Sequence, residues 1–145
     1  MIVVHATNSR SCWQEDSTWR IASRVHYSAP VLIYKYGWAT IDVLVAWRHR
    51  HLARDLGARV RRAISDARTH GITDRPDIVV HSFGSRLFTL LLADPVFADL
   101  AFGRVICAGS VVRPAFNCRA HIDAGRIEGV RNHVAGQHTA VPFAR

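Results

Sequence analysis

The sequence predicts an α/β protein with three layers, an αβα arrangement in which helices cover a mostly parallel sheet of about five strands. Short apolar runs typical of strands alternate with longer segments whose apolar residues recur at helical spacing. Two of these runs, near residues 78 and 105, are apolar on both faces, as in a parallel sheet covered by helices. The alternation predicts right-handed crossovers between the parallel strands. No domain boundary interrupts it, so residues 1–145 are expected to form a single domain.

The N-terminal part of the chain predicts two strands with a helix between them. Residues 2–4 are apolar and β-branched, which favours a buried strand. Apolar side chains at helical spacing between about 13 and 26 favour a helix. Pro30 then precedes a second apolar strand at residues 31–34, which ends in a loop at Gly37.

The clearest helix of the sequence runs from residue 47 to about residue 70. Its apolar residues repeat at i, i+4, i+8, i+11, i+12 and i+15, as Leu52, Leu56, Val60, Ala63, Ile64 and Ala67. The same helix predicts two ion pairs at i,i+4 spacing, Asp55 with Arg59 and Arg62 with Asp66. Gly71 provides a natural stop just beyond the helix.

Three strands and a second apolar helix complete the predicted fold. A strand at residues 78–81 leads into a tight turn at 82–85. A heavily apolar helix follows at 87–93 and ends before an Asp-Pro pair. The last two strands are expected at 104–108 and, with a weaker signal, at 129–134.

The turn at residues 82–85 carries the most informative local pattern, because Ser82 stands between a buried strand and a buried helix. In a nucleophile elbow the serine at such a corner is exposed above the sheet, and the following amide points into an oxyanion hole. The residues two before and two after the serine come close together and should be small. Gly84 meets this condition, whereas Val80 does not.

At this corner the sequence resembles the α/β-hydrolase superfamily. Residues 81–84, His-Ser-Phe-Gly, are similar to the His-Ser-x-Gly variant of its esterase-like members. Residues 2–7 resemble the family strand whose following loop donates the second oxyanion amide, with Ala6 in place of a glycine. Three more segments resemble further strands of the family, at residues 31–36, 104–110 and 130–141.

The resemblance implies hydrolysis of a small ester or acyl substrate with no cofactor and no metal ion. Ser82 would be the nucleophile. The amides of Phe83 and of the region around Ala6 and Thr7 would hold the oxyanion.

The other two members of a catalytic triad do not stand in the family positions. The family places its acid after the strand that here ends near Val134, and His138 occupies that turn. The catalytic histidine should follow another strand, but the chain stops at Arg145. The chain order Ser82, Asp123, His138 keeps the family order at different strands, so Asp123 and His138 are the candidate acid and base.

A non-catalytic protein with the same fold is the main alternative. The first two family strands and the last one are not found, so the chain is expected to be a minimal or truncated form. Such a protein would act through binding, and Ser82 would then be a helix N-cap, a role that serine readily fills. A reduced sheet also exposes its edge strands, so we expect a homo-oligomer formed through these open edges.

Charge suggests a third function, the binding of anions. The chain has 19 basic and 11 acidic residues, a net charge of +8, and Lys35 is its only lysine. Basic side chains crowd residues 48–68: Arg48, His49, Arg50, His51, Arg54, Arg59, Arg61, Arg62 and Arg68. Asp55 and Asp66 interrupt this run, and no nucleic-acid-binding motif accompanies it. We therefore expect a solvated helix face and do not expect nucleic acid as a partner.

Composition excludes several other classes of protein. With 49% hydrophobic and 21% charged residues, the chain is neither disordered nor fibrous. No apolar run reaches the roughly 18 residues of a membrane span, and the N-terminus lacks the pattern of a signal peptide. Cys12, Cys107 and Cys118 match neither a disulfide framework nor a zinc site, so free thiols in a reducing cytoplasm are expected.

Overall fold

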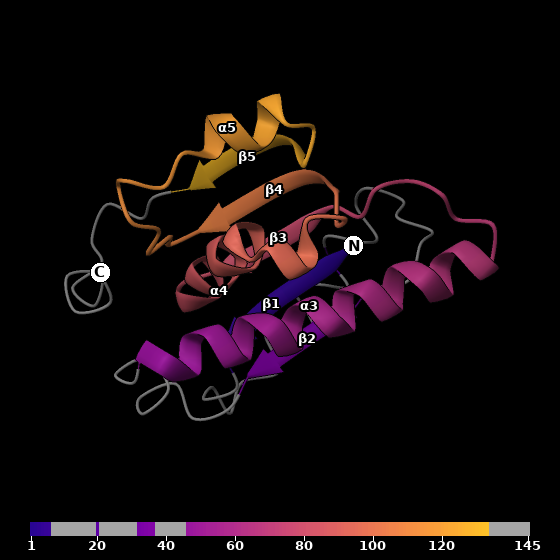
Figure 1. Ribbon diagram of the computed structural model, residues 1–145, viewed down its shortest axis with the longest axis horizontal. Helices are drawn as coiled ribbons and strands as arrows, with labels where there is room; N and C mark the ends of the chain where they lie inside the picture. The colour runs from indigo at the N-terminus through magenta and orange to yellow at the C-terminus, as the bar shows by residue number, and fades with distance from the viewer. Residues whose placement is uncertain (7–19, 21–31, 37–45, 134–145) are drawn as a thin grey trace.

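The computed structural model describes residues 1–6, 20, 32–36 and 46–133. The predicted helix at 13–26 falls almost entirely outside these residues, as do Thr7 and His138. The described chain forms one sheet of five parallel strands in the order β2-β1-β3-β4-β5 (Figure 1). The strands are β1 (Ile2–Ala6), β2 (Leu32–Tyr36), β3 (Ile78–His81), β4 (Phe102–Ala108) and β5 (Ile127–His133). The predicted α/β class and the parallel sheet are thus confirmed.

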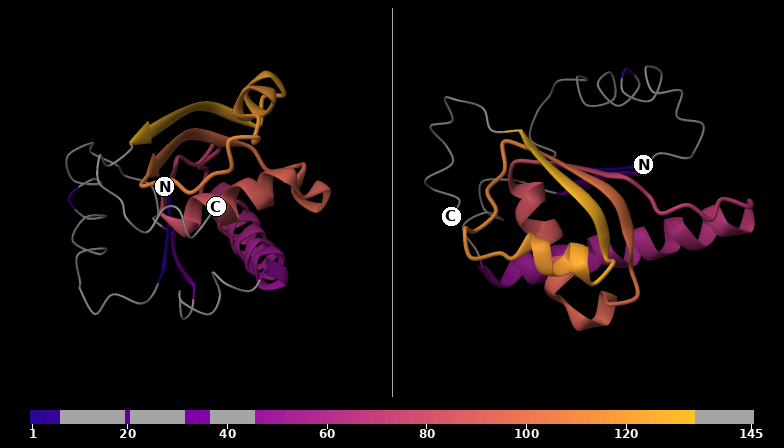
Figure 2. Two further views of the ribbon diagram at one scale, coloured as in Figure 1. Left: turned by 90° about the vertical axis from the view of Figure 1, so that its left-hand side faces the viewer. Right: turned by 90° about the horizontal axis from the view of Figure 1, so that it is seen from above.

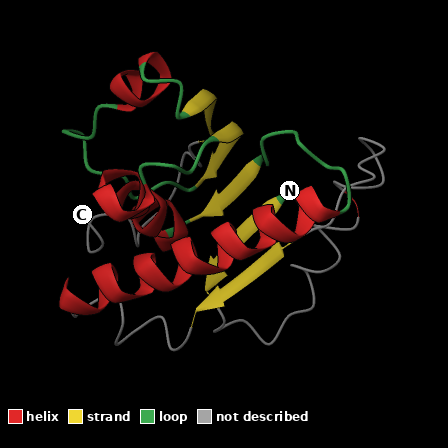
Figure 3. Ribbon diagram, turned by 45° about the vertical axis from the view of Figure 1, so that its right-hand side comes forward, coloured by secondary structure: helices red, strands yellow, loops and turns green. Residues whose placement is uncertain are grey.

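The described α-helices lie on the same side of this sheet in both views of Figure 2. They are α3 (Ala46–Thr69), α4 (Phe83–Ala93) and α5 (Cys118–Asp123), and a 3₁₀ turn, η1 (Pro95–Phe97), follows α4. The long helix α3 packs beside α4 and β2, as Figure 3 shows, while α5 lies against β5.

The hydrophobic core lies between the sheet and the helices α3 and α4. Because side chains alternate along a strand, every second residue faces this core. Register brings these residues into two buried rows across β1, β3 and β4: Ile2, Ile78 and Val105, then Val4, Val80 and Cys107. Helix α3 contributes Leu56 and Val60, and α4 contributes Leu87 and Leu91, all completely buried. Each such side chain contributes roughly 1.5–3 kcal/mol to stability by its burial.

The C-terminal end of α3 follows from local chemistry, and one surface prediction fails. Gly71 has φ 77°, and the amides of Gly71 and Ile72 donate to the carbonyls of Arg68 and Ala67, both at 3.0 Å. This is the Schellman arrangement that the glycine predicts. The predicted ion pair of Asp55 and Arg59 forms at 3.1 Å. The predicted pair of Arg62 and Asp66 is wrong, because no such contact occurs among the described residues.

Several element boundaries differ from the sequence predictions, and one helix was not predicted. Helix α4 begins at Phe83, four residues earlier than predicted. The chain changes direction at Ser82 alone, whereas the sequence predicted a turn over the four residues 82–85. Helix α5 was not predicted, since its six residues are too few to show apolar periodicity. It is started by Asn117, whose side chain accepts a hydrogen bond from the Ala120 amide at 3.1 Å. Strands β4 and β5 each begin two residues earlier than predicted.

Candidate active site

Ser82 lies at the point in the sheet where the strand order changes direction. From β1 the chain passes to β2 on one side and then to β3 on the other. In open α/β sheets, ligands bind at the carboxyl ends of the strands beside such a switch point. Strand β3 ends at His81, so Ser82 is the first residue beyond its carboxyl end.

The backbone of Ser82 is strained. Its dihedral angles are φ 49° and ψ −124°, and it is the only non-glycine residue with a positive φ in the part of the chain that the structure describes. Such a conformation costs about 1–3 kcal/mol and needs support from its surroundings. The Ser82 amide donates to the carbonyl of Ala108 at 2.9 Å, and the Ser82 carbonyl accepts from the amide of Ser85 at 3.0 Å.

Gly84 allows the first turn of α4 to lie directly against β1. A Cβ atom at this position would come within 2.8 Å of the Val4 carbonyl oxygen and 3.1 Å of Val4 Cγ1. The backbone of β1 therefore requires a small residue two positions after the serine, and Gly84 meets this requirement. Val80, two positions before the serine, is completely buried in the core.

The side chain of Ser82 does not serve as a helix cap. Ser82 occupies the N-cap position of α4, but its hydroxyl makes no capping hydrogen bond. The capping role that was the structural alternative for this residue is therefore wrong. The residue is half-buried at the C-terminal edge of the sheet, and its hydroxyl accepts and donates no hydrogen bond among the described residues.

Two of the candidate oxyanion residues, Phe83 and Ala6, belong to elements next to Ser82, and the third, Thr7, is outside the described residues. Phe83 is the first residue of α4, and the first N–H groups of a helix point away from it at the positive end of its dipole. The Phe83 ring is packed edge-on against His49 of α3, with ring centroids 4.7 Å apart. In the β1–β3 register Val4 lies beside Val80, which brings the end of β1 at Ala6 level with Ser82.

Asp123 is not brought to Ser82. It is the last residue of α5, and its carboxylate accepts from Arg119 Nε at 2.8 Å. Three residues later, the carbonyl of Arg126 accepts from the Phe102 amide at the start of β4. Because a crossover between parallel strands returns the chain to the edge where strands begin, Asp123 lies toward the edge opposite Ser82. The other candidate partner, His138, is outside the described residues.

Sequence reasoning missed the hydrogen-bonding role of Ser85, which holds the corner together. Its side chain is completely buried. The Ser85 hydroxyl donates to the Ser82 carbonyl at 2.7 Å and accepts from the Val111 amide at 3.0 Å. Ser110 Oγ lies 3.4 Å from the same hydroxyl. Ser85 therefore joins Ser82 to the connection that follows β4, and a serine inside an apolar helix was the available signal for such a role.

Several arginines of α3 act as structural contacts. Arg59 pairs with Asp55, which also accepts from the Tyr34 hydroxyl at 2.9 Å. Arg54 pairs with Asp94 just after α4 at 2.8 Å. Arg61 pairs with Asp99, donates to the Val96 carbonyl at 2.7 Å and lies over the Phe97 ring. These contacts reduce the charge that the helix face offers to an anionic partner.

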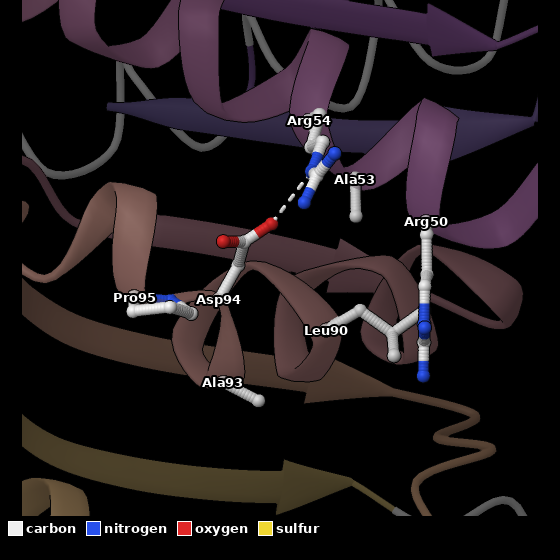
Figure 4. Close-up of a pocket in the computed structure, with 7 residues that line it drawn as sticks. All are labelled: Arg50, Ala53, Arg54, Leu90, Ala93, Asp94 and Pro95. Atoms are coloured by element: carbon white, nitrogen blue, oxygen red, sulfur yellow. Dashed lines mark hydrogen bonds and ion pairs between the residues drawn. The ribbon is translucent and has the colours of Figure 1, made fainter.

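A small pocket lies between α3 and the C-terminal half of α4 (Figure 4). Its volume is about 240 Å³, and it is lined by Arg50, Ala53, Arg54, Leu90, Ala93, Asp94 and Pro95. Typical ligand sites occupy roughly 300–1,000 Å³. The Arg54–Asp94 ion pair closes one side, and the pocket is at the opposite end of α4 from Ser82. It therefore forms no part of the candidate active site.

Within residues 1–6, 20, 32–36 and 46–133, no three His, Cys, Asp or Glu side chains gather closely enough to hold a metal ion. No helix in this part of the chain combines the length and the apolar composition that crossing a bilayer requires. Comparison of the chain with models of protein families, with curated proteins and with solved structures gave no match. Function is therefore inferred from the residues around Ser82.

Proposed function

We propose that this chain is a serine-dependent ester hydrolase of the α/β-hydrolase type, with Ser82 as its nucleophile. The observation that supports the proposal is the backbone of Ser82, strained at φ 49° between the end of β3 and the start of α4. Strain of this kind concentrates at functional sites. A sharp strand-to-helix turn that exposes a serine hydroxyl is the geometry of a nucleophile elbow.

The proposed reaction proceeds through an acyl-enzyme. Ser82 Oγ attacks the carbonyl carbon of the ester while its proton passes to the imidazole of His138. The carbonyl oxygen takes the negative charge and is held by amides of Phe83 and of the segment that follows β1. The C–O bond to the alcohol then breaks, and the alcohol leaves with the proton from His138. Water repeats the sequence on the acyl-enzyme, which releases a carboxylic acid and restores the Ser82 hydroxyl.

A second candidate function is binding without catalysis on the same scaffold. It is favoured by one observation, namely that the described residues place no imidazole or carboxylate within hydrogen-bond distance of the Ser82 hydroxyl. A serine hydroxyl without a base is a weak nucleophile. The fold would then hold an acyl or ester ligand at the switch point without cleaving it.

A serine-reactive fluorophosphonate probe tests the proposal directly. The wild type and a control variant at an exposed helical serine, Ser65→Ala, should be labelled, and Ser82→Ala should not. Hydrolysis of short-chain p-nitrophenyl esters should follow the same pattern. Equal labelling of wild type and Ser82→Ala would reject the assignment of Ser82. Labelling of Ser82 without ester turnover would favour the binding protein.

A further inference from the structure

Charge is distributed unequally between the two edges of the sheet. The described carboxylates lie along α3, at the edge where the strands begin, or early in β5: Asp55, Asp66, Asp74, Asp77, Asp94, Asp99, Asp123 and Glu128. At the other edge, where β3 and β4 end and Ser82 lies, the described residues include no carboxylate. Two arginines, Arg86 and Arg113, belong to this edge. Among the described residues, this edge of the sheet therefore carries positive side chains and no negative ones.

Arg86 stands in the first turn of α4, four residues after Ser82. Helical side chains lean toward the N-terminus of their helix, which here is the end occupied by Ser82. The side chain is half-buried, and its pKa is lowered first by burial and then by the positive charge of Arg113. It forms no ion pair and no side-chain hydrogen bond with the described residues. A partly buried guanidinium in this state lacks the acceptor that normally offsets its desolvation.

Arg113 belongs to the connection after β4, which packs against the first turn of α4. Two residues before it, the Val111 amide donates to Ser85 Oγ, which fixes this connection against the first turn of α4. Arg113 also has no ion pair among the described residues. Two like charges held close together repel each other, and an anion that contacts both would remove this repulsion.

We propose that Arg86 and Arg113 bind a carboxylate carried by the substrate of Ser82, so that the site takes monoesters of short dicarboxylic acids. The inference rests on the proposed function, because it names the substrate class of the same site. A guanidinium donates two parallel N–H groups to a carboxylate, which gives geometric selectivity as well as attraction. Four residues of helix rise about 6 Å, which matches a few carbon atoms between the ester carbonyl and the carboxylate.

The first test compares kcat/KM for monomethyl succinate and dimethyl succinate, which differ in the free carboxylate. Arg86→Gln and Arg113→Gln should each lower the value for the monoester about 10-fold to 100-fold, as expected when a charged hydrogen bond is lost. The value for the diester should change by less than about twofold. Arg62→Gln, at an exposed position on α3 with no ion pair to any described residue, is the matched control and should change neither value. Equal losses for both esters would overturn the proposal.

A second test does not depend on turnover. Calorimetric titration with succinate should show binding to the wild type and to Ser82→Ala. Binding should weaken in Arg86→Gln, and Arg86→Lys, which keeps the charge but not the planar fork, should recover part of it. Absence of succinate binding to folded wild type would overturn the carboxylate site. If Ser82 escapes the fluorophosphonate probe while succinate still binds through Arg86, the hydrolase proposal fails and the carboxylate site stands.

Discussion

Gly84 and Val4 are in closer contact than any side chain at position 84 would permit, since a Cβ atom there would lie 2.8 Å from the Val4 carbonyl oxygen. The first prediction concerns this contact. Gly84→Ala must push α4 away from β1, and we expect a loss of about 1–3 kcal/mol in the free energy of unfolding. Gly129→Ala on β5 is the control, because a Cβ there has no neighbour within 4 Å. Urea denaturation of both variants measures the difference, and equal stability would show that α4 can move freely.

The buried hydroxyl of Ser85 gives the second prediction. Ser85→Ala removes the acceptor of the Val111 amide and the donor to the Ser82 carbonyl. Leaving a buried amide unsatisfied costs about 1–3 kcal/mol, and the support for the strained residue is lost with it. We expect lower stability in urea together with slower fluorophosphonate labelling of Ser82. A variant that is destabilised but labelled at the wild-type rate would show that Ser85 supports only the fold.

The third prediction separates structural arginines from solvated ones on α3. Arg61→Gln should lower the free energy of unfolding by roughly 1 kcal/mol, because Arg61 contacts Asp99, the Val96 carbonyl and the Phe97 ring. Arg62→Gln, one residue further along, should leave stability within about 0.5 kcal/mol of wild type. Thermal unfolding of the two variants at equal ionic strength makes the comparison. Equal effects would mean that the arginines of this helix act only through net charge.

The fourth prediction concerns stability in acid. The pKa of Asp94 is held below its usual range first by a hydrogen bond from Arg54, then by one from the Val96 amide, with Arg50 adding a favourable charge. A carboxylate with a depressed folded-state pKa contributes stability that is complete above the unfolded value, about 3.9. This contribution disappears as the pH falls through the lower folded value. Between pH 5 and pH 2.5, wild type should therefore lose more stability than Asp94→Asn, and parallel curves would contradict the assignment.

The fifth prediction concerns the edge strand β5, whose residues beyond Ile127 are largely exposed. If two copies of β5 pair antiparallel about an axis between Gly129 and Val130, Glu128 of each copy stands opposite Arg131 of the other. We expect sedimentation to show a dimer that Glu128→Arg dissociates through like-charge repulsion. The combined variant Glu128→Arg with Arg131→Glu should restore it. A wild-type chain that sediments as a monomer at all concentrations would reject this pairing.

Much of the fold could be predicted because the local signals agreed with the global arrangement. Apolar periodicity located α3, and the β-branched runs located the central strands with their two buried rows. Helix α5 escaped prediction because six residues carry no measurable period, and it depends on the cap from Asn117. The early start of α4 escaped because glycine and serine at 84 and 85 are typical of turns, while here close approach and buried hydrogen bonding require them.

The candidate site was predictable only where its members are neighbours in sequence. Ser82, Phe83 and Gly84 form one local motif, and the structure brings them together at the switch point. Asp123 was chosen by chain order alone, which does not reveal how far along the crossover from β4 to β5 the residue stands. The contacts of Ser85 with Val111 join segments 26 residues apart, and no sequence spacing indicates them.

The strain at Ser82 opposes stability and the proposed reactivity at a single position. Glycine would adopt φ 49° without the steric penalty that serine incurs, so the most stable residue here is one that carries no hydroxyl group. Under the proposed function, the glycine that relaxes this corner also removes the hydroxyl that would attack the ester. If Ser82 is the nucleophile as proposed, a search for thermostable variants of this chain would select glycine at position 82 early, and those variants would no longer cleave esters.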